Sequence, residues 1–145
     1  MSGPRLYLIG SLRNPRVPEI GCKIRRLGFD VFDDWFAAGP EADDRWQAYE
    51  QGRGRSYGEA LTGEAARNVF SFDHRHLWTS DGCVLLQPAG KSGHLEFGAM
   101  VGRGKPSFML FDKEPDRWDV MTHFADGVFF DFNVLAEALK CRWNL

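Results

Sequence analysis

The sequence predicts a single α/β domain built on a doubly wound parallel sheet of about five strands, with helices on both faces. Short apolar segments alternate along the chain with segments in which apolar residues recur at helical intervals. Such alternation is typical of parallel strands joined by right-handed helical crossovers. The 145 residues are close to the commonest domain size, 43% of them are hydrophobic, and no linker or repeat divides the chain. One domain over residues 1–145 is therefore expected.

The first half of the chain predicts a β-α-β unit, then a loop and a long helix. An apolar run that ends at Gly10 is followed by a loop and by apolar residues at helical intervals, which stop at Gly28. A second β-rich run ends in two acidic residues before Trp35. The next segment is rich in Gly, Asp and Arg, and its apolar residues show no periodicity. Apolar residues at helical intervals then reappear. The expected elements are a strand at 6–10, a helix at 17–27, a strand at 29–33, a loop at 36–54 and a helix at 56–77.

The second half predicts three more strands that alternate with helices. The third strand is apolar until its last residue, as a strand covered on both faces should be, and Pro88 and Gly90 mark its end. The expected elements are a strand at 83–87, a helix at 93–102, a strand at 107–111, a short helical stretch at 118–124, a strand at 128–130 and a helix at 133–140. Together these elements predict a flavodoxin-like or Rossmann-like sheet.

Charge and cysteine content exclude several classes of partner. Lys and Arg total 18 against 20 Asp and Glu, so the net charge of −2 creates no long-range field for nucleic acid or anionic lipid. No signal sequence and no apolar run near the ~20 residues of a membrane span are visible. Cys22, Cys83 and Cys141 are an odd number and far apart, which indicates free thiols in a reducing cytoplasm. We expect a cytoplasmic protein with a small-molecule ligand.

The predicted ligand site lies at the carboxyl ends of the strands. In doubly wound sheets, ligands bind beyond these ends, near the switch in strand order. The glycines there permit close approach of the backbone, and the helix that follows the third strand offers N–H groups to an anion. Glu96 is expected in the first turn of that helix, facing the crevice. The other candidate residues are Gly10, Ser11, Arg13, Asp33, Trp35, Gly90, Lys91, Ser92 and Gly93.

Two other motifs are rejected. Gly90-Lys91-Ser92 looks like the end of a phosphate-binding P-loop, but that motif needs Gly five positions earlier, where the chain has Leu85. His74 and His76 could suggest a metal pair, yet Arg lies between them and no Cys is near, which favours packing or solvation. No metal and no cofactor are predicted.

Taken in order, the segments resemble the nucleoside 2-deoxyribosyltransferase family and its relatives that hydrolyse nucleoside 5′-monophosphates. The likeness spans residues 5–135, nearly the whole chain. Its motifs are the opening strand and glycine loop at 7–13, Asp73 ahead of the third strand, Ser80-Asp81 at its start, the stretch 92–100 around Glu96, and Gly104-Lys105-Pro106 beyond it.

The resemblance implies a retaining displacement at the anomeric carbon of a nucleoside or nucleotide. Glu96 would be the nucleophile, Tyr7 would orient its carboxylate, and Asp73 would direct a proton on the departing base. A second base or water would then resolve the glycosyl-enzyme. Asp119 would reach into the site of a neighbouring subunit, so a homodimer or larger homo-oligomer is expected. The sugar and the 5′ side would be lined by Gly10, Ser11 and Arg13.

The chain also departs from the family pattern. Nucleoside-specific members carry an acid six positions before the nucleophile, where this chain has Gly90, whereas Arg13, Lys91 and Ser92 suit a phosphate. Two rival functions stay open: a NAD-type nucleotide glycohydrolase, and a non-catalytic nucleotide-binding sensor on the same fold.

Each candidate side chain also has a plain structural interpretation. Glu96 could serve only as a helix-dipole partner, Tyr7 could fill core, Asp73 could cap a helix, and Trp35 could pack instead of stacking on a base.

Overall fold

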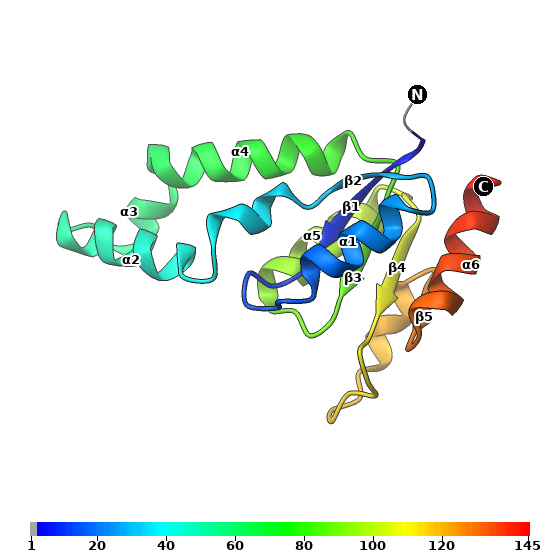
Figure 1. The fold of residues 1–145 in the computed structure, drawn as a ribbon. Coiled ribbons are helices and arrows are strands. Elements are labelled where there is room, and N and C mark those ends of the chain that lie inside the picture. Colours follow the sequence, from blue (N-terminus) through cyan, green and yellow to red (C-terminus); the bar gives the residue numbers. More distant parts are fainter. Residues whose placement is uncertain (1–2) are drawn as a thin grey trace.

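The computed structural model describes residues 3–145 and confirms the predicted fold class (Figure 1). Five parallel strands form one sheet in the order β2-β1-β3-β4-β5. The strands are β1 (Arg5–Ile9), β2 (Asp30–Phe32), β3 (Gly82–Leu86), β4 (Ser107–Leu110) and β5 (Gly127–Phe129). The α-helices are α1 (Val17–Arg25), α2 (Ala42–Gly52), α3 (Tyr57–Leu61), α4 (Glu64–Trp78), α5 (Lys91–Gly102) and α6 (Phe132–Trp143).

The two faces of the sheet are covered by different helices. Leu6 and Leu8 of β1 point to one face, where they join a core cluster with residues of α1 and α6. Tyr7 and Ile9 point to the other face and pack with residues of α4 and α5. This alternation is the period-two geometry of a strand, and every residue of β3 is buried because both of its faces are covered. Tyr7 therefore lies under α5.

The segment predicted as a long loop is helical, and this prediction was wrong. Residues 34–38 form a 3-10 helix and α2 follows it. The sequence pattern misses α2 because the helix buries only one residue, Glu50, whose carboxylate lies 3.2 Å from Arg55. With no apolar face on the helix, no apolar periodicity exists to be found.

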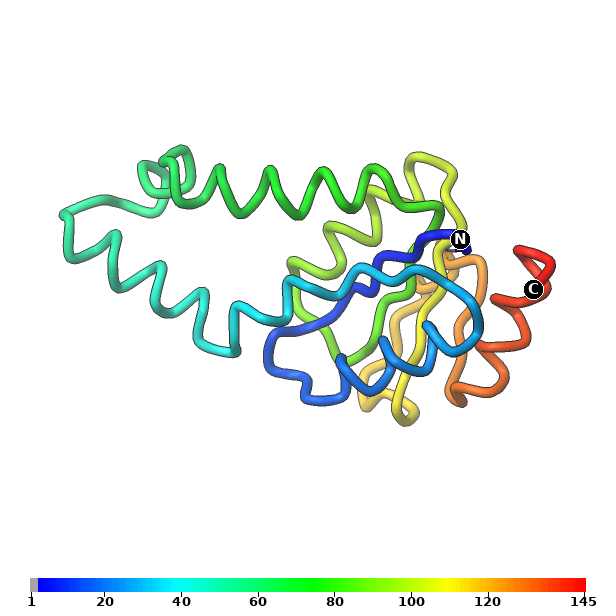
Figure 2. Tube along the Cα trace, turned by 45° about the horizontal axis from the view of Figure 1, so that its top comes forward, coloured from blue at the N-terminus to red at the C-terminus, as the bar shows by residue number. Residues whose placement is uncertain are grey.

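The long helix predicted at 56–77 is broken into α3 and α4. A capping box between Ser56 and Glu59 begins α3, and Gly63 in an extended conformation separates it from α4. Figures 1 and 2 show that α2, α3 and the first part of α4 project from the sheet as an arm. No helix within residues 3–145 has the length and apolar character that a bilayer crossing needs.

Candidate active site

The contact between Tyr7 and Glu96 forms the centre of the site. The Tyr7 hydroxyl donates a hydrogen bond to Glu96 Oε2 at 2.9 Å, joining β1 to α5 across 89 positions of sequence. Gly93 permits this approach, because a Cβ there would lie 3.3 Å from side-chain atoms of both Ile9 and Leu85. Glu96 therefore sits at the flank of α5 that faces β1 and α4.

Glu96 lies in the second turn of α5, so the prediction of a first-turn position was wrong. The helix begins at Lys91, directly after Gly90, two residues earlier than the sequence pattern suggested. The first-turn dipole that stabilises an anion falls off within one turn, so it does not dominate at this carboxylate. Burial and neighbouring side chains set its chemistry instead.

The site holds two carboxyl groups and one phenol whose protonation is perturbed. Burial raises the pKa of Glu96 to about 7, the charge of Asp73 adds to this rise, and the hydrogen bond from Tyr7 opposes it. Burial also raises the pKa of Asp73, on α4. The pKa of Tyr7 is raised by burial and by both carboxylates, so its hydroxyl stays protonated and donates. The three residues assigned to catalysis from the sequence thus come together.

The glycine loop after β1 lies under Trp35. A Cβ on Gly10 would lie 3.6 Å from the Trp35 ring, and the Trp35 indole N–H donates to the Leu8 carbonyl at 2.8 Å. Ser11 Oγ accepts from the Arg13 backbone N–H at 3.1 Å, and the Arg13 guanidinium pairs with Asp44 of α2 at 3.0 Å. Trp35 closes the end of β1, which gives it a packing role.

Asp33 is already engaged by the protein. Its two carboxylate oxygens accept from Arg25 of α1, and its side chain is only 13% exposed. A Cβ on Gly21 of α1 would collide with this carboxylate. Contact between Asp33 and a ligand stays a prediction, and the side chain faces α1.

At the start of α5, Gly90 is the N-cap and carries no side-chain cap, while Lys91 and Ser92 are exposed. A Cβ on Gly90 would meet no atom within 4 Å, so the backbone is open to approach there.

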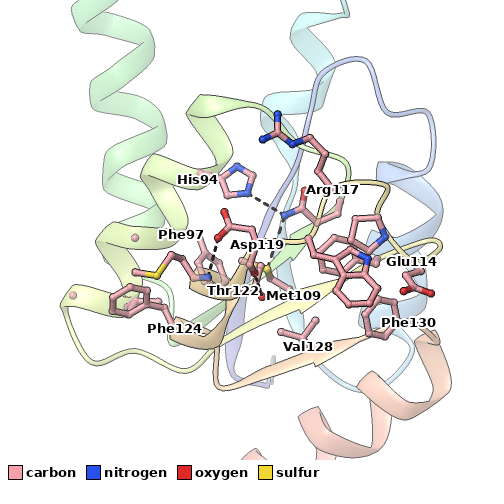
Figure 3. Close-up of a pocket in the computed structure, with 18 residues that line it drawn as sticks. His94, Phe97, Met109, Glu114, Arg117, Asp119, Thr122, Phe124, Val128 and Phe130 are labelled. Atoms are coloured by element: carbon pink, nitrogen blue, oxygen red, sulfur yellow. Dashed lines mark hydrogen bonds between the residues drawn. The ribbon is translucent and has the colours of Figure 1, made fainter.

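A cavity of about 750 Å³ opens beside α5 (Figure 3), and Glu96 is not among the residues that line it. Phe97, Met109, Phe124 and Val128 contribute apolar walls between α5, β4, β5 and the 3-10 helix η2 (Val120–Phe124). Asp119 lies on its rim and accepts from the Met121 backbone N–H at 2.9 Å, which caps η2.

The histidines rejected as metal ligands have packing partners. His74 stacks on Phe70 and Trp78, and His76 stacks on Phe32 at a centroid distance of 4.0 Å. Within residues 3–145 no group of three or more His, Cys, Asp or Glu side chains could hold a metal ion.

Comparison with known proteins links this geometry to a fold. A 2-deoxyribosyltransferase from Bacillus psychrosaccharolyticus superposes with a TM-score of 0.62 at 20% identity, over 91% of this chain and 90% of that one. The chain has the fold of a 2-deoxyribosyltransferase. A conserved protein from Enterococcus faecalis shares the fold with a TM-score of 0.64 at 14% identity, over 97% of this chain and 99% of that one. No family model and no curated protein matches the sequence.

The 2-deoxyribosyltransferase fold confirms the resemblance seen in the sequence at the level of architecture. Two polar residues beside the site, Gln87 and His94, were missed. Gln87 is buried at the end of β3, and a buried amide in an otherwise apolar strand was the signal available in the sequence.

Proposed function

We propose that this protein cleaves the N-glycosidic bond of a (deoxy)nucleoside or its 5′-monophosphate, with Glu96 as the nucleophile. The Tyr7–Glu96 hydrogen bond beside Asp73 is the observation that carries the proposal. The fold shared with a 2-deoxyribosyltransferase supports it.

In the proposed reaction, one carboxylate oxygen of Glu96 attacks the anomeric carbon and the bond to the base nitrogen breaks. The Tyr7 hydroxyl holds Oε2, which leaves Oε1 free to attack. Asp73, whose pKa is raised by burial, supplies a proton to the departing base. A second base or water then attacks the glycosyl ester and regenerates the Glu96 carboxylate.

Product chromatography tests this function. The protein is incubated with a panel of nucleosides, 5′-monophosphates and NAD, with and without a second free base. Release of a free base supports the proposal, and a new nucleoside in the presence of the second base assigns transfer over hydrolysis. Cleavage of NAD alone would instead assign a NAD-type glycohydrolase. Binding without any base release over hours would identify a nucleotide sensor.

The pH dependence should follow Glu96. Because the pKa of this nucleophile is about 7 and only the carboxylate attacks, kcat/KM should fall as the pH drops below about 7. Tyr7→Phe removes the hydrogen bond that lowers this pKa, so the acid limb should move to higher pH. Profiles of kcat/KM for both proteins check this, and an unchanged acid limb would contradict the role of Tyr7.

A 5′-monophosphate should be preferred over the matching nucleoside. Arg13, Lys91 and Ser92 offer donors, and charge-assisted hydrogen bonds contribute about 1.5 to 3 kcal/mol each. Arg13→Ala should lower kcat/KM for the monophosphate far more than for the nucleoside. Arg26→Ala, which removes an exposed arginine at the far end of α1, is the control. Equal losses on both substrates would limit Arg13 to its ion pair with Asp44.

We also propose that the protein is a homodimer or larger homo-oligomer, in which Asp119 reaches a neighbouring site. Four aromatic residues near the C-terminus give this proposal little support, because Phe129, Phe132 and Trp143 pack on the chain's own core and only Phe130 of the four is exposed. The surfaces of α4 and η2 support it better. The exposed apolar side chains of these two elements, together with Trp118 just before η2, are Val69, Phe70, Phe72, Trp78, Trp118, Val120, Met121 and Phe124.

Light scattering measures the assembly directly. A mass of at least twice the 16.5 kDa protomer is expected at micromolar protein. Phe70→Glu should lower the measured mass, because it places a charge on the exposed face of α4. A monomer with full activity would remove the intersubunit role of Asp119.

A further inference from the structure

Gln87 and His94 are joined by a closed set of hydrogen bonds around the loop that leads from β3 into α5. The Ala89 backbone N–H donates to Gln87 Oε1 at 3.0 Å, and Gln87 Nε2 lies 3.0 Å from His94 Nε2. His94 Nδ1 lies 2.7 Å from the Gly90 carbonyl oxygen. Figure 3 shows His94 at the edge of the large cavity, with its bond to the Gln87 amide.

The chemistry of these groups permits one arrangement of protons. A backbone N–H only donates, so the Gln87 atom that faces Ala89 must be the carbonyl oxygen, and the amide nitrogen must face His94. An amide nitrogen also only donates, so His94 Nε2 accepts. The single ring proton of neutral His94 then sits on Nδ1 and donates to the Gly90 carbonyl.

This arrangement fixes the backbone that opens α5. The Gly90 carbonyl also accepts from the His94 backbone N–H at 3.3 Å, so it is held by both the main chain and the ring of the same residue. The Gln87 side chain is anchored because it is buried, with its amide nitrogen also 3.9 Å from Met109 Sδ. Gly90 has open space above its Cα and no side-chain cap.

We propose that His94 and Gln87 form a clamp that positions the Gly90–Ser92 backbone for the substrate, with His94 working only as the neutral Nδ1–H tautomer. The proposal rests on the function proposed above, in which this loop meets the sugar or its 5′ group. Neither residue touches the reacting atoms, so both are positioning residues. Loss of the clamp should weaken ground-state binding and leave the chemical step nearly unchanged.

Protonation of His94 breaks the clamp. A proton on His94 Nε2 would point at the NH₂ group of Gln87, so two donors would face each other. If the Gln87 amide turned over to present its oxygen to His94, its NH₂ group would face the Ala89 N–H, which is also a donor. Asp119, Arg117 and Glu114 face His94 across the cavity, while Lys91 and Glu96 lie on its own helix. In the comparison below, four of these charged side chains are unchanged and Glu96 is replaced by Gln in both proteins, so their effect cancels.

With the Gln87→Glu substitution, the clamp should need a protonated His94 instead of a neutral one. A carboxylate at position 87 can accept from the Ala89 N–H with one oxygen, and from a protonated His94 with the other. Binding of 2′-deoxyguanosine 5′-monophosphate is measured by calorimetry across pH in the Glu96→Gln background, which removes the titration of the nucleophile. With Gln87, binding should weaken by about tenfold as His94 becomes protonated, and with Gln87→Glu it should weaken as His94 loses its second proton.

The tautomer of the His94 ring can be measured without any ligand. Long-range ¹H–¹⁵N spectra of the histidine rings, assigned with His94→Phe, should show His94 protonated on Nδ1 at alkaline pH. His94→Phe should raise KM by roughly tenfold with little change in kcat. Glu137→Gln, on the exposed surface of α6, is the control and should leave KM unchanged.

Two results would overturn the clamp. One is a His94 ring that carries its proton on Nε2. The other is binding that changes with pH in the same direction in the Gln87 protein and in the Gln87→Glu variant. If no panel substrate is cleaved or bound, the proposed function fails, and the ring tautomer alone then decides whether the clamp exists.

Discussion

Glu96→Gln should reduce kcat by roughly 10³-fold or more while leaving substrate binding largely intact, since the amide keeps the shape of the side chain but cannot attack the anomeric carbon. The amide also still accepts the hydrogen bond that Tyr7 donates at 2.9 Å, so the local structure should persist. Single-turnover rates and substrate affinities measured on both proteins separate the two effects. Glu137→Gln, on the exposed surface of α6, is the matched control and should retain full activity.

The covalent intermediate has its own test. A 2-fluoro-arabinosyl substrate analogue slows the second step more than the first, so a glycosyl group should accumulate on the peptide that contains Glu96. Mass spectrometry of a digest locates it. Labelling of any other side chain would assign the nucleophile to that residue, and a Glu96→Gln variant with wild-type activity would exclude the displacement altogether.

Asp73→Asn should lower kcat by about 10²- to 10⁴-fold for substrates with a neutral base, because the departing nitrogen loses its proton donor. The carboxyl of Asp73 is suited to this role, since burial raises its pKa. The loss should be much smaller for 7-methyl-2′-deoxyguanosine, whose base already carries a positive charge and leaves without a proton. Measuring kcat for both substrates on both proteins provides an internal control for folding.

Equal losses on the two substrates would mean that Asp73 acts on Glu96 and not on the base. The structure makes this outcome distinct, because the charge of Asp73 helps to raise the pKa of Glu96. In that case Asp73→Asn should also move the acid limb of the pH profile to lower pH, toward the ordinary range of a carboxylic acid.

The five strands could be predicted because their signal is local. A strand such as β3, which is buried on both faces, needs consecutive apolar residues. Such a run of apolar residues can be recognised in the sequence without knowledge of the fold. By contrast, α2 has no such signal, since Glu50 is its one buried residue and most of its other residues are exposed on the projecting arm.

Asp33 shows that strand periodicity indicates the direction of a side chain as well as its place at a strand end. It lies two residues after Val31, which faces α1, so the period of a strand places both side chains on that face. The acid was predicted in the crevice from its position at a strand end alone, whereas the side-chain direction leads it to Arg25.

The sequence by itself determined the α/β class, the single doubly wound sheet and the identity of the carboxylates and phenol worth testing. Only the tertiary structure decided how they meet. Tyr7 and Glu96 are 89 positions apart, and their contact depends on the parallel pairing of β1 with β3 and on the close packing of α5 that Gly93 allows. The raised pKa of Glu96 follows from burial among residues of three elements, and burial is a property of the packed chain that no local pattern contains.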